Sequence, residues 1–323
     1  MIVALAGGVG GAKLADGLYA ELPAGQLVVI GNTADDLVLH GLHISPDLDT
    51  VMYTLSGLAN PLTGWGIAGD TFQALEMMAR YGGPDWFRLG DRDLATHISR
   101  TALLHSGATL THTTAQLITA LGIQATLLPM CDERVETIIE TPDGPLSFQD
   151  YFVHRGCRDQ VRGVHVQGIE QATITEAIQE ALTKASAIVI CPSNPLVSVG
   201  PILAVPGMRQ AIRRSGVPIV AVSPIIAGQA VKGPAATMLQ GLGLEVSAAG
   251  VAKVYEDLRP IMLIDEADAA LAPAVEAAGA RPVAAPILMQ TVQDRHSLAR
   301  RVLQLCGYPL AAVSGNKQAS DQR

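Results

Sequence analysis

The chain has 323 residues, 49% of them hydrophobic, which is enough apolar material for a sizeable core. Its 22 Lys and Arg against 30 Asp and Glu give a net charge of −8, which argues against a nucleic-acid binder or a membrane-surface protein that relies on basic patches. There is no basic leader, no apolar run of the ~20 residues that cross a bilayer, and no dense cysteine pattern, so we expect a cytoplasmic protein.

The first predicted unit is a strand, a glycine loop and a helix. Residues 2–6 are a continuous apolar run, and leucines recur every four positions from 14 to 22. The loop between them holds glycines at positions 7, 8, 10 and 11, and such a loop favours anion binding because free amides and the helix dipole face it. Lys13 departs from both the Walker A and the dinucleotide fingerprints. A tight turn without a ligand is the alternative.

Four carboxylates follow the second predicted strand, residues 26–30. Asp35 and Asp36 come where a dinucleotide enzyme carries its ribose-binding carboxylate, which makes an NAD-dependent oxidoreductase one hypothesis. Asp47 and Asp49 lie two apart, so in an extended chain they project to the same side. Oxygen ligands suit Mg²⁺, and a phosphate loop beside them favours a metal–diphosphate site. For each aspartate, the alternative to a metal ligand is a turn residue or a helix cap.

Two histidines, His40 and His43, flank the same acidic stretch. They would suit a softer transition metal, but in a loop they more often orient neighbouring groups or contact a ligand.

Residues 89–101 predict a helix that Asp91 caps. Its expected apolar stripe consists of Leu94, Ile98 and Ala102. A second face carries Asp93, His97 and Arg100. This polar row is either an exposed ladder of ion pairs or a wall of the active site, where Arg92 or Arg100 meets phosphate.

The second half repeats the alternation of strand and helix. Short apolar runs occupy residues 187–190, 217–222, 260–264 and 281–288. Polar loops follow two of these runs, with Ser193 and Asn194 in one and Ser223 and Gly228 in the other. Ligands of open α/β sheets bind at such strand ends, so all four are candidate binding residues, with ordinary proline-containing turns as the alternative.

These elements predict an α/β protein with a Rossmann-like, mostly parallel sheet and helices on both faces. We expect residues 1–50 and 160–313 to form the nucleotide-binding core. Residues 51–159 form an insertion, mainly helical up to about 130, with a β-hairpin at 135–153 closed by Pro-Asp-Gly. The polar tail 314–323 is expected to be disordered.

Several segments together resemble the 2-phospho-L-lactate transferase family of coenzyme F420 biosynthesis. They are, in order, AGGVGGAK, NTADD, HGLHISPDLDTVMYTL, GWGI, GDRDLATHISRT, LPMCDER with its trailing VET, CPSNPLVSVGPIL and SPIIAG. The resemblance implies an Mg²⁺-dependent transfer from a guanosine diphosphate-linked three-carbon acid to the terminal ribityl hydroxyl of the deazaflavin Fo. GMP leaves and a phosphodiester forms.

The resemblance also implies roles for the singled-out residues. The donor's diphosphate would lie on Gly8, Val9, Gly10 and Gly11, and its nucleotide on Ser193, Asn194, Ser223 and Gly228. Asp35 and Asp49 would hold Mg²⁺, and one of the aspartates or His40 would act if a base is needed. The acceptor side would comprise Asp36 and Asp47, which are also second-choice metal ligands, with Trp65, Asp91, Arg92, Asp93 and His97.

Two rivals to this interpretation are a related regulatory protein that binds nucleotide-linked ligands without transfer, and the NAD-dependent oxidoreductase. The transferred acid, whether lactate, enolpyruvate or glycerate, cannot be read from the sequence. An apolar chain of this size is expected to form a homodimer.

Overall fold

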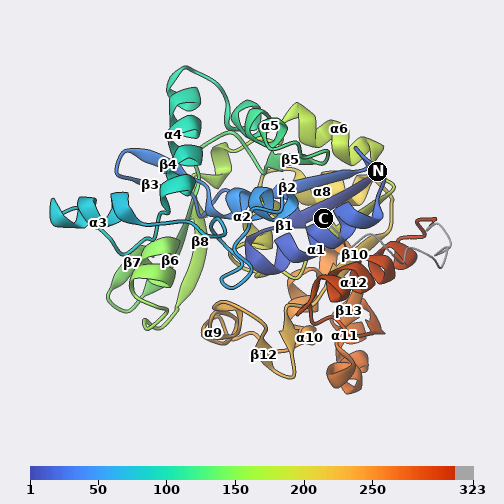
Figure 1. The fold of residues 1–323 in the computed structure, drawn as a ribbon. Helices are drawn as coiled ribbons and strands as arrows, with labels where there is room; N and C mark the ends of the chain where they lie inside the picture. The colour runs from blue at the N-terminus through green and yellow to red at the C-terminus, as the bar shows by residue number, and fades with distance from the viewer. Residues whose placement is uncertain (310–323) are drawn as a thin grey trace.

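The computed structural model describes residues 1–309, so the predicted tail 314–323 lies outside the described part of the chain. A seven-stranded parallel sheet forms the centre, in the order β14-β13-β10-β9-β1-β2-β5 (Figure 1). Its strands are β1 (Ile2–Ala6), β2 (Leu27–Gly31), β5 (Thr126–Pro129), β9 (Ala187–Ile190), β10 (Ile219–Val222), β13 (Ile261–Ile264) and β14 (Arg281–Ala284).

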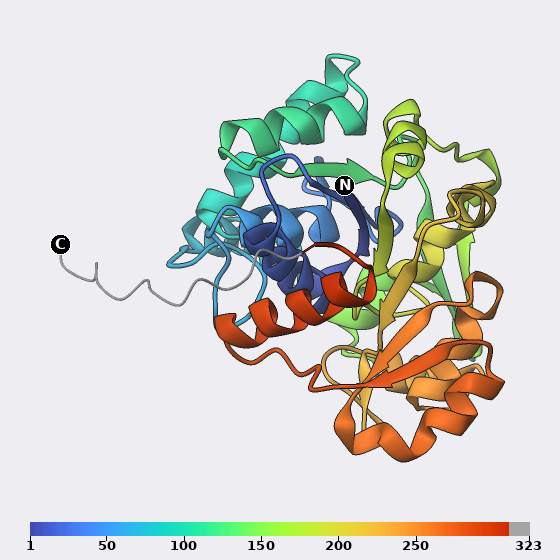
Figure 2. The same cartoon turned by 90° about the vertical axis from the view of Figure 1, so that its right-hand side faces the viewer.

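Helices cover both faces of this sheet, as expected. One apolar core lies under α1 (Gly8–Glu21), α2 (Pro46–Leu55), α5 (Leu110–Ala120) and α12 (Val292–Leu305), and Figure 2 shows α12 beside α1. The other core lies under α6 (Glu176–Lys184), α7 (Val199–Ala204), α8 (Met208–Arg214), α9 (Ala235–Gly241), α10 (Ala248–Val254) and α11 (Ala272–Ala277). The five inner strands are apolar because both faces of the sheet are covered, whereas the edge strands β5 and β14 begin with the exposed Thr126 and Arg281.

The remaining elements lie around this core. They are the hairpin β3 (Leu37–Leu39) and β4 (Leu42–Ile44), helices α3 (Gln73–Arg80) and α4 (Asp91–His105), strands β6 (Glu136–Thr141), β7 (Gly144–Ser147) and β8 (Gly163–Gln167), and the hairpin β11 (Ile225–Ile226) and β12 (Gln229–Ala230). A π-helical turn spans Asp150–His154, and 3₁₀ turns span Ile169–Gln171, Glu256–Leu258 and Glu266–Leu271.

The range 51–159 is less separate than the sequence suggested. It contains α3, α4, α5 and the predicted hairpin β6–β7, but it also supplies β5, which pairs with β2 in the main sheet. In addition, β8 pairs with β6 and extends the hairpin to three strands. Within residues 1–309, no helix is long and apolar enough to cross a membrane.

The order of the strands fixes where a ligand site belongs. From β1 the chain runs outward through β2 and β5 on one side, and later through β9, β10, β13 and β14 on the other. The loops leaving the carboxyl ends of β1 and β9 therefore lead to helices on opposite faces of the sheet, and a ligand crevice is expected at this edge, beside the two loops.

Candidate active site

A cavity of about 460 Å³ lies at this crevice. The loops after β1, β2, β9 and β10 line it together with segments from the range 51–159. Of the predicted residues, Gly8, Val9, Gly10, Asp35, Asp47, Asp49, Trp65, Asp93, His97, Ser193, Asn194 and Ser223 contribute to its wall. Gly11, Asp36, His40, Asp91, Arg92 and Gly228 are not among its lining residues.

The glycine loop packs tightly against the loop that follows β9. The Gly7 amide donates to Ser193 Oγ at 3.0 Å. A Cβ added at Gly10 would overlap the Pro192 carbonyl oxygen, and one at Gly11 would overlap Ser193 Oγ. These two glycines are therefore required by the close approach of a second loop, and the ligand is not needed to explain them. Gly8, with φ +61°, needs glycine for its backbone conformation.

Two buried carboxylates converge beside this loop. Asn32 Nδ2 lies 3.0 Å from Asp35 Oδ2 and 3.0 Å from Asp47 Oδ2, so one amide bridges both side chains. Asp47 Oδ1 accepts the Gly8 amide at 2.8 Å. Asp35 Oδ1 is buried and has no hydrogen-bond partner. No pattern in the sequence indicates the bridging role of Asn32, because that role depends on α2 meeting the end of β2.

Burial raises the pKa of both carboxyls. For Asp47 it does so to about 6, with the Asn32 and Gly8 hydrogen bonds opposing the change. Burial raises the pKa of Asp35 well above its usual range, and repulsion from Asp47 acts in the same direction. Two desolvated carboxylates that repel each other, one with an open oxygen, form a site that a hard cation would stabilise.

Asp49 points away from this pair. The expectation that Asp47 and Asp49 share one side of an extended chain is wrong, because both lie in α2, where residues two apart differ by about 200°. Arg100 Nη1 donates to Asp49 Oδ2 at 3.1 Å, and Nη2 contacts the other oxygen. Arg100 therefore occupies both oxygens that the predicted metal role required.

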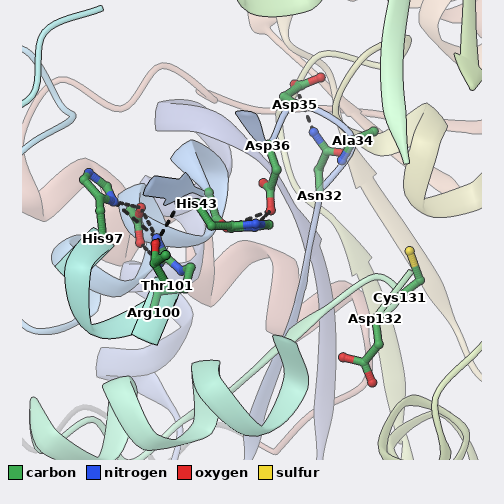
Figure 3. A network of polar contacts seen from close by, with 12 residues as sticks. Asn32, Ala34, Asp35, Asp36, His43, His97, Arg100, Thr101, Cys131 and Asp132 are labelled. Atoms are coloured by element: carbon green, nitrogen blue, oxygen red, sulfur yellow. Dashed lines mark hydrogen bonds and ion pairs between the residues drawn. The ribbon is translucent and has the colours of Figure 1, made fainter. Parts of the chain in front are cut away.

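The polar row of α4 is its buried face. Asp93, His97 and Arg100 are buried, whereas Ile98 in the expected apolar stripe is 55% exposed. The prediction of a buried Leu94, Ile98 and Ala102 stripe is therefore wrong. Asp93 and His97 line the cavity, whereas Arg92 and Arg100 are not among its lining residues. His97 lies 3.3 Å from Asp93 and 3.7 Å from Asp49. Figure 3 shows His97 and Arg100 side by side on this helix.

Tyr53 completes the wall from α2. Its hydroxyl donates to Asp93 Oδ1 at 2.6 Å. Burial acts to raise the pKa of Asp93, but His97 and Tyr53 outweigh it, and the net change is downward. Asp93 is thus held ionised at the edge of the cavity.

Asp91 and Arg92 take part in hydrogen bonds at the N-termini of α3 and α4. Asp91 does not cap its own helix, whose N-cap is Gly90; its carboxylate accepts the amides of Gln73 and Ala74, each at 3.0 Å, at the start of α3. In return, the Asp70 carboxylate accepts the amides of Arg92 and Asp93 at the start of α4. The two aspartates therefore join α3 to α4.

The other predicted residues outside the cavity lie in turns or buried contacts. His40, with φ +53°, forms the turn of the β3–β4 hairpin with Gly41. Gly228, with φ +72°, lies in the β11–β12 turn. The half-buried Asp36 lies 3.0 Å from His43 Nε2, as Figure 3 shows, and accepts a hydrogen bond from Ser45 Oγ at 2.7 Å. None of them is placed to act on a ligand in the cavity.

Five Trp and Phe residues line the cavity, and we call them the aromatic wall. Its members come from three separate segments: Trp65, Trp86, Phe87, Phe148 and Phe152. The Phe148 and Phe152 rings stack at 5.3 Å, and Trp86 meets Phe87 edge to face at 5.7 Å. Only Trp65 was identified from the sequence, since no local pattern joins these segments. Such a wall suits a flat ring system.

The metal-binding capacity of the cavity is limited to its carboxylate pair. In the described chain, no group of three or more His, Cys, Asp or Glu side chains is arranged to hold a metal ion. Two carboxylates are nonetheless what Mg²⁺ commonly takes from a protein when substrate phosphates and water complete its shell.

The chain is similar to known proteins over most of its length. The family model of 2-phospho-L-lactate transferase CofD matches residues 2–294. A phosphoenolpyruvate transferase of Streptomyces griseus subsp. griseus is 46% identical over 311 residues, covering 94% of this chain and 98% of that protein. A 2-phospho-L-lactate transferase of Methanosarcina mazei is 42% identical over 303 residues, covering 94% and 99%.

Solved structures share the fold. The crystal structure of a UPF0052 family member from Bacillus halodurans matches with a TM-score of 0.66 at 16% identity, covering 94% of this chain and 98% of that one. The family match extends over the glycine loop, the carboxylates and the polar helix alike. The chain belongs to the 2-phospho-L-lactate transferase CofD family.

Proposed function

We propose that this protein transfers a phospho-organic-acid group from a guanosine diphosphate-linked donor to the terminal ribityl hydroxyl of Fo. GMP leaves, and the phosphodiester F420-0 or its dehydro form results. One observation carries the proposal: a single cavity joins an amide-rich loop and two buried carboxylates to an aromatic wall. A phosphorylated donor and a flat aromatic acceptor would meet there.

Asp35 and Asp47 are the proposed Mg²⁺ ligands, in place of the pair Asp35 and Asp49. The unpartnered Asp35 Oδ1 and the raised pKa of both carboxyls fit a cation. Asp49 is instead neutralised by Arg100. Mg²⁺ bound there would offset the negative charge that develops on the phosphate oxygens during displacement.

The chain's own groups position the two substrates. The amides of Val9 and Gly10 at the start of α1 face the donor's diphosphate, and Ser193, Asn194 and Ser223 line the side proposed for its nucleotide. The aromatic wall and the α4 row bearing Asp93 and His97 enclose the acceptor. Phosphoryl-type transfer through a loose transition state depends mainly on such positioning, so no strong base is required.

The transferred acid is lactate, enolpyruvate or glycerate. The relatives at 46% and 42% identity are named for phosphoenolpyruvate and 2-phospho-L-lactate transfer, respectively. A homodimer and a cytoplasmic location complete the proposal.

The test is a competition assay with mass detection. The protein is incubated with Fo, Mg²⁺ and equal amounts of the lactyl, enolpyruvyl and glyceryl donors, and the deazaflavin products are weighed. The proposal expects one dominant phosphodiester product and equimolar GMP. Donor binding without any new deazaflavin species would instead support the regulatory, non-catalytic alternative.

A further inference from the structure

Two lysines reach the cavity from different parts of the chain. Lys13 lies on α1, and Lys232 lies in the segment between β12 and α9; both line the wall beside the glycine loop. An added Cβ at Gly64 would lie 3.4 Å from Lys232 Nζ and would overlap the Val9 side chain. The Lys232 head group therefore lies next to the first turn of α1.

These two lysines differ from the others in their partners. Of the four lysines in residues 1–309, Lys184 and Lys253 each pair with a glutamate three or four positions away. Lys13 Nζ instead donates to the Met289 carbonyl at 2.8 Å, and Lys232 Nζ donates to the Thr63 carbonyl. Neither has a carboxylate within ion-pair distance in the described part of the chain.

Each ammonium group therefore keeps donors to spare and lacks a counter-ion. A lysine head group has three N–H donors, and one backbone carbonyl satisfies one of them. Burial lowers the pKa of both lysines. For Lys13 the charges of Arg295 and Lys232 add to the effect on its pKa, and the more distant Asp294 carboxylate opposes it without outweighing it. Two cations that repel each other at the rim of a cavity are stabilised by an anion bound between them.

We infer that Lys13 and Lys232 form a two-point clamp that grips the two phosphates of the donor and selects a diphosphate over a monophosphate. The inference rests on the proposed function and adds two residues to it. Lysine suits this role because it binds phosphate as a point charge from a flexible stem. After transfer, GMP carries one phosphate and engages one lysine at a time, which favours its release.

Calorimetric titration of the full chain without acceptor tests the clamp. The ligands are GDP, GMP, guanosine and inorganic diphosphate, and the variants are Lys13→Met, Lys232→Met and Lys232→Arg. Each Met variant should lower GDP affinity about tenfold relative to GMP, while guanosine binding stays unchanged. Lys232→Arg keeps the positive charge and should therefore lose less GDP affinity than Lys232→Met. Lys253→Met, which removes an exposed lysine away from the cavity, is the matched control.

The possible results distinguish a failure of the clamp inference from a failure of the proposed guanosine donor. An unchanged preference for GDP over GMP in both Met variants would overturn the clamp and leave the guanosine donor in place. Lysine-dependent binding of inorganic diphosphate without GDP binding would support the clamp and contradict the donor. Thermal melting shows whether each variant folds. If Lys13→Met does not fold, the comparison of Lys232→Met with Lys232→Arg still tests the clamp.

Discussion

Asn32 explains how two carboxylates come to lie side by side in the interior. Isolated buried carboxylates are costly, and a group bonded to both is needed to hold them together. The fully buried Asn32 amide donates to Asp35 and Asp47 and also to the Val197 carbonyl at 3.1 Å. The result is a pair of acidic side chains kept ready for a cation.

The stability of the metal-free protein should fall as the pH rises through the range in which Asp47 ionises. Its pKa is raised to about 6, so the folded state binds a proton more readily than the unfolded state, and the ionisation penalty is absent below pH 4 and complete above pH 6. Asp47→Asn removes this penalty. It should raise stability by roughly 3 kcal/mol at most at pH 8 and by about half as much at pH 5.

Thermal melting of both proteins in chelator at the two pH values measures this difference. Equal shifts at pH 5 and pH 8 would show that Asp47 is not the titrating group.

At the scale of single residues, the sequence predicted which side chains are near the site better than it predicted where those side chains point. Asp35, Asp47 and Asp49 are all candidates in the sequence, but an extended stretch would present Asp47 and Asp49 to the same side, whereas the helix α2 separates them. Pro46 at the start of α2 was the available signal, since proline favours the first turn of a helix. Asn32, Lys13 and Lys232 acquire roles only through partners distant in sequence.

At the scale of elements, the Asp49–Arg100 ion pair holds α2 against α4. Arg100 is 1% exposed, so its loss leaves the Asp49 carboxylate buried without compensation. Arg100→Met should destabilise the protein by about 3–5 kcal/mol in urea unfolding. The double variant Asp49→Asn with Arg100→Met should lose less, because no unpaired charge remains.

Arg92→Met provides the control, since the exposed Arg92 side chain donates only to the Ala68 carbonyl. A cost for Arg100→Met no larger than that of this control would refute the bracing role of the ion pair.

The contact between the glycine loop and the loop after β9 is equally specific. Gly10→Ala brings a Cβ onto the Pro192 carbonyl, a backbone atom that cannot move alone. The expected cost is about 1–3 kcal/mol of stability, accompanied by weaker GDP binding because both loops line the cavity. Gly163→Ala is the matched control, because its nearest atoms are side-chain atoms of Glu140 at 3.4 Å. Equal melting temperatures for the two variants would contradict this packing argument.

Strands were the most predictable elements because buried parallel strands are continuous apolar runs. Residues 2–6 match β1, and residues 187–190 match β9. The orientation of α4 was not predictable, because its apolar stripe and its polar row are both at helical spacing. The network of Tyr53, Asp49 and the α4 row decides which face is buried.

At the scale of the whole molecule, the cavity brings together segments that are up to about 280 residues apart, from Gly7 to Met289. The α/β class and the strand-end location of the site followed from the sequence, because the alternation of strands and helices dictates them. The aromatic wall did not, because its members are brought together only by the packing of the range 51–159 against the core.

Trp86 offers a direct test of the acceptor side. Trp86→Ala should weaken Fo binding about tenfold, since stacking on a ring system contributes roughly 1–3 kcal/mol, and should leave GDP binding unchanged. Tyr81→Ala removes an aromatic side chain that is 81% exposed and lies outside the cavity wall, so it should change neither affinity. Parallel calorimetric titrations measure both. A loss of GDP affinity in Trp86→Ala with Fo binding intact would reverse the assignment of the two sides.

The most direct measurement is the rate of Fo conversion as Mg²⁺ is titrated, in the wild type and in Asp35→Asn and Asp47→Asn. The account predicts Mg²⁺-dependent formation of a phosphodiester by the wild type, and a loss of about a hundredfold or more in each variant. Asp143→Asn, in the exposed β6–β7 turn, should behave as wild type. Wild-type Mg²⁺ dependence and rate in either cavity variant would contradict the account.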